Sequence, residues 1–305
     1  MDATWVIMPI LAQPDYTRAA IADCLSQSVP TRLLLINQGV EDSFRDELER
    51  IAEAHEDRVL LWSHQPPLPS LAATWNRALD FVWEVGGTEA LVVNADVRLH
   101  RATIEVLLNC LRGTRALFVS AVGVREGQFD SNFDHLTVSS GQRGGPDFSC
   151  FLISHDCHAR FRFDEQHIPA YTEDLTFHRE VMLAGEGSRI FSVAMPYLHY
   201  ASGTLKALSL DARAALECQI EGISRAYYRQ AWGGPPNEER YAVKGDPSSA
   251  RDGVTTPELQ RLVLARQDDG AVRGDACTAT EDSPARDSSG RRLGDDIQLA
   301  RRGDQ

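Results

Sequence analysis

Several features that would place a protein in a particular class are missing from this sequence. Its six cysteines include no Cys-x-x-Cys pair and no interleaved histidines, so neither a zinc site nor a disulfide framework is predicted. No apolar run is long enough to cross a bilayer, and the amino terminus lacks the basic-then-apolar pattern of an export signal. We therefore expect a cytoplasmic protein without a transmembrane segment.

Positive charge is also scarce. Lysine and arginine total 31 residues against 44 aspartates and glutamates, which gives a formal net charge of −13. Nucleic-acid-binding proteins attract the phosphate backbone with basic surfaces, so this balance predicts no nucleic-acid partner. An anionic ligand would need local positive charge, which a bound cation supplies.

The first 120 or so residues alternate between strand-like and helix-like segments. Apolar runs at Trp5–Ile10, Arg32–Ile36 and Val59–Ser63 are each followed by a helix-like segment, at Tyr16–Ser26, Ser43–His55 and Leu68–Val85. Such alternation predicts an α/β fold with a mostly parallel sheet flanked by helices. With 305 residues and 43% hydrophobic content, the chain can bury one sizeable core of this kind.

Two oxygen-bearing side chains follow a predicted buried strand near residue 90. The aliphatic run Ala90–Val93 leads directly into Asn94 and Asp96. Ligand crevices of open α/β sheets form at the carboxyl ends of strands. Positions 94 and 96 lie on the same side of an extended chain, so their oxygens can share a hard divalent cation that bridges to phosphate. Because Asn-x-Asp is also common turn chemistry, a simple turn remains an alternative.

An acidic pair and a histidine follow later in the chain. Glu173 and Asp174 occupy the first turn of a helix predicted from Leu175 to Ala184, with Thr172 as its N-cap. The helix dipole favours acids at any helix start, so the pair also fits an ordinary helix terminus. His199 ends a later strand-like stretch, where a histidine serves either as a packing residue or as a ligand.

The order and spacing of these segments resemble the glycosyltransferase family 2 pattern on the Rossmann-like GT-A fold, from about residue 5 to about residue 232. In that resemblance Asn94 and Asp96 stand at the Asp-x-Asp metal motif, and His199 stands at a carboxyl-terminal metal-binding histidine. Glu173 and Asp174 stand at the catalytic acidic pair. The family usually has Asp at the first metal position, so Asn94 removes one charge from the cation's shell and should weaken its binding.

The same resemblance implies contacts with a nucleotide-sugar donor. Pro9 lies in the segment Val6–Ile10, which looks like the first strand, and Asn37 and Gln38 belong to the turn that would contact the nucleobase. Asn76 lies in the helix before the metal strand, and the two metal-motif residues complete the donor-binding set. The nucleobase turn usually carries Asp, and amides both donate and accept hydrogen bonds, so the base of the donor stays open.

The function that the resemblance implies is sugar transfer from a nucleotide diphosphate sugar to the hydroxyl of a carbohydrate or other acceptor. Mn²⁺ or Mg²⁺ would assist, Asp174 would be the general base and Glu173 would orient the acceptor. A single base-like acid favours inversion. One alternative is a non-catalytic nucleotide-sugar-binding protein, which Asn94 suggests. Another is a nucleotidyltransferase, although Met8–Gln13 offers neither glycine nor lysine for a phosphate loop.

The composition divides the chain into three parts. Residues 1–205 form the expected GT-A domain and residues 206–244 a helical extension. Residues 245–305 are rich in Asp, Arg, Gly, Ser and Thr. Such a segment cannot bury enough apolar surface to offset its ordering entropy, so a disordered tail is predicted.

An amphipathic helix is predicted within the extension, from Ser209 to Ala231. Leu216, Ile220, Ile223 and Tyr227 share one face, and a Gly-Gly-Pro-Pro sequence stops the helix. An apolar stripe of this kind serves either core packing or the interface of a homodimer.

Overall fold

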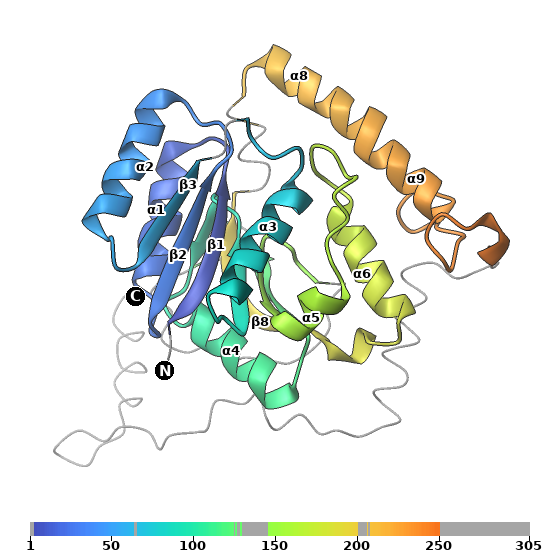
Figure 1. Cartoon of the computed structure of the whole chain (residues 1–305), viewed down its shortest axis with the longest axis horizontal. Helices are drawn as coiled ribbons and strands as arrows, with labels where there is room; N and C mark the ends of the chain where they lie inside the picture. Colours follow the sequence, from blue (N-terminus) through green and yellow to red (C-terminus); the bar gives the residue numbers. More distant parts are fainter. Residues whose placement is uncertain are drawn as a thin grey trace, which may run out of the picture.

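A sheet of eight strands forms the centre of the computed structural model, which describes residues 3–63, 66–124, 126, 129, 146–200, 206 and 208–250 (Figure 1). The strands are β1 (Thr4–Ile10), β2 (Thr31–Asn37), β3 (Val59–Ser63), β4 (Glu89–Val93), β5 (Val97–Leu99), β6 (Phe118–Val124), β7 (Cys150–Ser154) and β8 (Ile190–His199). Their order across the sheet is β3-β2-β1-β4-β7-β6-β8-β5.

Most of these strands run in one direction. β3, β2, β1 and β4 are parallel to one another, and β6 and β8 share their direction. β7 and β5 run against their neighbours. The predicted mostly parallel α/β sheet is confirmed. The carboxyl ends of β1, β2 and β4 lie at the same edge, which is where ligands bind in such sheets.

Helices cover both faces of the sheet (Figure 1). They are α1 (Pro14–Leu25), α2 (Asp42–Ala54), α3 (Leu71–Glu84), α4 (Thr103–Thr114), α5 (His155–Arg160) and α6 (Glu173–Leu183). α1, α2 and α4 share one apolar core with the sheet, and α3, α5 and α6 share a second core on the opposite face. Along β1, Val6 and Met8 belong to the first core and Ile7 to the second, as the alternation of a strand requires.

The helix starts show where local sequence decides the structure. Ser70 caps α3 because its side-chain oxygen accepts a hydrogen bond from the Ala73 N–H at 3.1 Å. Thr172 occupies the predicted N-cap position of α6, and its carbonyl oxygen accepts from the Thr176 N–H at 3.0 Å, but its side chain does not cap the helix as Ser70 does. The Thr172 backbone is left-handed, with φ 66°, and its hydroxyl makes no capping hydrogen bond.

The extension is helical but not one regular helix. α8 (Leu210–Gln219) continues into the π-helical segment η3 (Ile220–Arg225) and then into α9 (Ala226–Trp232), which ends at a left-handed Gly233. The predicted stripe is wrong at Ile223, which is 45% exposed, because the wider π turn rotates the following residues relative to a regular helix.

The extension packs on α6. Tyr228, Ala231 and Trp232 form a small buried core with Leu175 and Leu183. Core packing, one of the two roles predicted for this helix, is therefore observed, and a homodimer stays a prediction.

A buried ion pair holds the chain beyond α9 against α6. The fully buried Arg179 of α6 lies 3.8 Å from Glu239 and donates to the Tyr241 carbonyl oxygen at 2.9 Å.

The region after the extension includes further ordered residues. The predicted tail begins at Gly245, but its first residues include the short 3-10 helix η4 (Pro247–Ser249), and Tyr241 forms a β-bridge with Ala250. Another short 3-10 helix, η2 (Gly187–Arg189), precedes β8. Residues 251–305 of the predicted tail lie outside the described residues. In the ranges described, no helix has both the length and the apolar character needed to cross a membrane.

Candidate active site

A cavity of about 780 Å³ lies at the carboxyl edge of the parallel strands. It is lined by seven residues that the sequence predicted for the site: Pro9, Gln38, Asn94, Asp96, Glu173, Asp174 and His199. Pro9 lies within β1, Gln38 directly follows β2 and Asn94 directly follows β4. Segments up to 190 residues apart in the sequence, from Pro9 to His199, thus meet around one hollow.

Asp96 and His199 are brought together by strand pairing. β5 and β8 are antiparallel neighbours in which Val97 faces His199, and the Tyr200 N–H donates to the Asp96 carbonyl oxygen at 3.1 Å. The His199 Nε2 atom consequently lies 3.4 Å from Asp96 Oδ1. Burial lowers the pKa of His199, but the hydrogen bond and charge of Asp96 and the charge of Asp147 outweigh it, so the pKa is raised.

The donor atoms at this point fit a divalent cation. Asp96 offers a carboxylate and His199 an imidazole nitrogen, and the Asn94 amide lines the same cavity. Within the described ranges no three His, Cys, Asp or Glu side chains are placed to hold a metal. A cation bound here would therefore need Asn94, water or ligand phosphate oxygens to complete its shell, which suits a hard metal with oxygen ligands.

The acidic pair begins α6 and faces the same cavity. Glu173 is 3% exposed, and its Oε2 atom is buried without a hydrogen-bond partner among the described residues. Desolvation and the charge of Asp174 raise the pKa of Glu173 well above its usual range. Burial also raises the pKa of Asp174, against the effect of hydrogen bonds from backbone N–H groups. Desolvation thus overrides the helix dipole, as a general base near neutral pH requires.

We expect Glu173→Gln to raise the melting temperature at neutral pH. Because the folded pKa of this carboxyl is raised, its contribution to stability is fully present below the unfolded pKa and is lost as pH rises through the folded pKa. Glutamine removes the buried charge, so a gain of about 1–2 kcal/mol, or roughly 2–8 °C in Tm, is expected at pH 7.5. Differential scanning calorimetry from pH 4.5 to 8 measures it.

The control for this prediction is Glu53→Gln, since Glu53 is exposed on α2. It should leave the Tm and its pH dependence unchanged. Equal Tm values for Glu173→Gln and the wild type at both ends of the pH range would show that the Glu173 carboxyl is not desolvated.

Two residues predicted to bind the donor do not line the cavity. Asn37 is 4% exposed, and its Oδ1 atom accepts hydrogen bonds from the N–H groups of Gly39 at 2.8 Å and Val40 at 3.0 Å. It forms the turn that presents Gln38 to the cavity. In the structure Asn37 thus supports this turn, and its contact with a nucleobase stays a prediction.

Asn76 is the second such residue. It is 2% exposed, its amide donates to the Phe163 carbonyl oxygen and to Glu165, both at 2.8 Å, and its oxygen accepts from the Phe163 N–H at 3.1 Å. These bonds connect α3 to the segment that leads towards the acidic pair. The amide of Asn76 is fully hydrogen-bonded within the protein, so its predicted contact with the donor stays a prediction.

Sequence reasoning missed two polar residues in the cavity wall. Asp147 follows a stretch without any motif, and it brings a carboxylate near His199 and Asp174, whose pKa values it raises. Trp75 lies in α3, is 2% exposed and keeps its indole Nε1–H buried without a partner among the described residues. Its position beside Asn76 was the only sequence signal.

The ionisable side chains that line the cavity are mainly acidic. Asp96, Asp147, Glu173 and Asp174 line it, whereas the described lining residues include no lysine or arginine. An anionic ligand would be repelled here unless a cation accompanied it.

Comparison with known proteins identifies the fold. No family model matches the chain, and no curated protein matches it. Among solved structures, the mannosyltransferase PcManGT from Pyrobaculum calidifontis in complex with GDP-Man and Mn²⁺ matches with a TM-score of 0.54 and 13% identity, covering 86% of this chain and 68% of that one.

Two further solved structures match at a similar level. S. aureus TarS 1-349 has a TM-score of 0.50 and 13% identity over 75% of this chain and 73% of that one. GalNAc-T7 with UDP, GalNAc and Mn²⁺ has a TM-score of 0.51 and 8% identity over 65% of this chain and 43% of that one. The fold implied by the sequence motifs is thereby confirmed: the chain has a GT-A-like glycosyltransferase fold.

Proposed function

We propose that the protein transfers a sugar from a nucleotide diphosphate sugar to an acceptor hydroxyl, by inversion and with the help of Mn²⁺ or Mg²⁺. The observation that carries this proposal is the meeting of Asp96 and His199 with the acidic pair in one cavity. Mannosyltransferase PcManGT, which shares the fold, was solved with GDP-Man and Mn²⁺. The excess of carboxylates around the cavity supports a need for a cation whenever a diphosphate enters.

The predicted site residues that line the cavity would divide the reaction between them. Asp96, His199 and Asn94 would hold the cation, which supplies positive charge where negative charge grows on the departing diphosphate. Gln38 and Pro9 line the same cavity, where they would contact the donor.

The acidic pair acts on the acceptor. Asp174 takes the proton of the acceptor hydroxyl, and the oxygen electron pair then bonds to the anomeric carbon. The bond from that carbon to the diphosphate breaks, and its electrons leave with the phosphate oxygen. Glu173 orients the acceptor through its otherwise unpartnered oxygen. The raised pKa of Asp174 makes it a stronger base than a solvated aspartate.

The test is incubation of the full chain with UDP-, GDP- and dTDP-sugars, each with and without Mn²⁺, with release of free nucleoside diphosphate as the readout. A parallel thermal-shift series detects binding alone, since a ligand at 100 times its Kd stabilises the folded state by about 2.7 kcal/mol. Release together with a shift supports transfer. A shift without release identifies the non-catalytic binding protein, and the absence of both rejects a nucleotide-sugar ligand.

Asn94→Asp should strengthen metal binding. The added carboxylate increases the charge of the donor set formed with Asp96 and His199, and the affinity of such oxygen-rich sites rises with ligand charge. We expect the Mn²⁺ concentration for half-maximal activity, or for half-maximal thermal stabilisation, to fall. Asn37→Asp serves as the control, because Asn37 lies outside the cavity wall. An unchanged Mn²⁺ requirement in Asn94→Asp would exclude Asn94 from the cation's shell.

A further inference from the structure

The segment that leads into the acidic pair has an unusual backbone. Tyr171 and Thr172 both have left-handed conformations, with φ values of 72° and 66°. Such φ values are uncommon outside glycine and are unfavourable for a β-branched residue such as threonine. Two in succession persist only where surrounding contacts hold them. They set the direction in which Glu173 and Asp174 enter α6.

Ser224 of the extension supplies the contacts to this segment. Its hydroxyl donates to the Tyr171 carbonyl oxygen and lies 3.1 Å from the Thr172 hydroxyl oxygen. Ser224 is fully buried. It lies within η3, the π-helical segment, whose first residue, Ile220, lines the cavity. Irregular π turns in helices frequently occur at functional positions.

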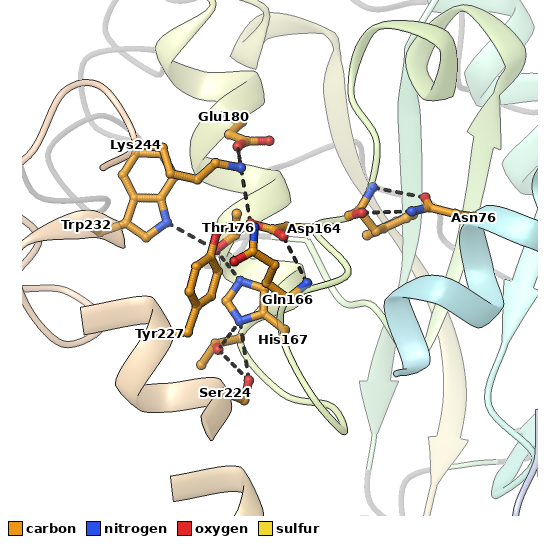
Figure 2. Close-up of polar contacts among 12 residues, drawn as sticks. Asn76, Asp164, Gln166, His167, Thr176, Glu180, Ser224, Tyr227, Trp232 and Lys244 are labelled. Carbon is orange, nitrogen blue, oxygen red and sulfur yellow. Dashed lines mark hydrogen bonds and ion pairs between the residues drawn. The ribbon is translucent and has the colours of Figure 1, made fainter. Parts of the chain in front are cut away.

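His167 completes the network from the other side. It is fully buried, and its Nδ1 atom lies 3.0 Å from the Thr172 hydroxyl and its Nε2 atom 2.9 Å from the Thr176 hydroxyl (Figure 2). The Trp232 indole donates to the same Thr176 oxygen at 3.1 Å. Burial lowers the pKa of His167 to about 4, so the ring is neutral at pH 7. We assign its proton to Nε2, which leaves Nδ1 to accept from Thr172.

A separate set of contacts anchors the extension without touching residues 171 and 172. Lys244 forms ion pairs with Asp164, at 3.2 Å, and with Glu180, and Tyr227 donates to Asp164 at 2.6 Å (Figure 2). These residues attach the extension to the rest of the protein without contacting the segment that leads into the acidic pair. The contacts of Ser224 and His167 differ because they end on the two left-handed residues beside the acidic pair.

We propose that Ser224 and His167 are positioning residues, which hold Tyr171 and Thr172 in the left-handed conformation that aims Glu173 and Asp174 into the cavity. The inference rests on the proposed function and extends it by making the helical extension part of the catalytic unit. Ser224→Ala, Thr172→Val and the conservative Thr172→Ser test it, with Lys244→Ala as the matched anchoring control.

The kinetic expectation separates positioning from anchoring. Ser224→Ala and Thr172→Val should lower kcat roughly 10- to 100-fold with little change in the donor KM, since a misplacement of about 1 Å can have that effect. Thr172→Ser, which keeps the hydroxyl, should restore most of kcat. Lys244→Ala should lower Tm while keeping kcat. Loss of activity in proportion to loss of Tm across all four variants would overturn the proposal.

A second measurement does not depend on catalysis. The pH dependence of Tm that comes from the buried Glu173 carboxyl should diminish in Ser224→Ala, because a released acidic pair gains solvent, and should persist in Lys244→Ala. An unchanged pH dependence in Ser224→Ala contradicts positioning even if the protein transfers no sugar. A wild type that releases no nucleoside diphosphate but shows the expected difference between these variants contradicts the proposed function and leaves the positioning role supported.

Discussion

Asp174→Asn should reduce sugar transfer by about 10²–10⁴-fold, the usual contribution of a general base, while the protein still binds its donor. Asparagine fills nearly the same space but cannot take the acceptor proton. Asp174 lines the cavity, and burial raises its pKa, so wild-type kcat/KM should increase with pH as this carboxyl ionises. Steady-state release of nucleoside diphosphate gives kcat, and donor thermal shifts report binding in the inactive variant.

The matched control is Asp211→Asn. Asp211 is also an acid in the first turn of a helix, but it is exposed on α8. It should leave kcat unchanged, which separates the chemistry of Asp174 from the effect of a charge at a helix start.

Glu173→Gln tests whether Asp174 or Glu173 is the general base. If Glu173 only orients the acceptor, this variant should raise the acceptor KM more than it lowers kcat. Wild-type turnover in Asp174→Asn together with an inactive Glu173→Gln would transfer the role of base to Glu173.

The parts of the fold that sequence predicted are those decided locally. β1, β2 and β4 are apolar runs between turn residues. Strands of a parallel sheet are buried on both faces and are therefore continuously apolar, so these runs predicted the parallel sheet. β5 has three residues and exists because it pairs with β8, about 100 positions later, so no local pattern marks it. The reversed direction of β7 likewise depends on its pairing with β4 and β6.

The site was predictable where residue type alone limits the chemistry. Asp96, His199 and Asp174 were selected as carboxylates and an imidazole at the ends of predicted elements, and the structure places all three in the wall of one cavity, whereas their chemical roles stay predictions. Asn37 and Asn76 lie outside the cavity wall, and their amides bond within the protein, so their predicted contacts with the donor stay predictions. An amide can satisfy either a ligand or a backbone, and the partners of Asn76 lie at residues 163 and 165, far away in the sequence.

The helix start at residue 173 shows a different limit. Thr172 before Glu173 fits the local capping pattern, yet its hydroxyl bonds to His167 and Ser224 instead of to the helix backbone. A tertiary network of three buried polar side chains overrides the local preference. That network includes a residue from the extension, 52 positions away, so the capping pattern could not anticipate it.

Removal of the cation should abolish activity. Treatment with EDTA should reduce nucleoside diphosphate release to background, and Mn²⁺ or Mg²⁺ in excess should restore it. The physical reason is the charge of the cavity, where four carboxylates surround the space that a diphosphate would enter. Without a cation, both the binding of the donor and the charge developing on the leaving group are opposed.

Asp96→Ala tests the same cation at its principal carboxylate, and it should eliminate both activity and the stabilisation of the protein by Mn²⁺. The raised pKa of His199 arises mainly from the hydrogen bond and charge of Asp96, with a smaller effect of Asp147, so it should fall in this variant, which NMR titration of the imidazole can follow. Because a metal needs the neutral imidazole, Mn²⁺ affinity in the wild type should decrease as pH falls through the pKa of His199. Full turnover after chelation would exclude the cation. The positive charge would then be sought at Lys206, whose ammonium already lowers the pKa of His199.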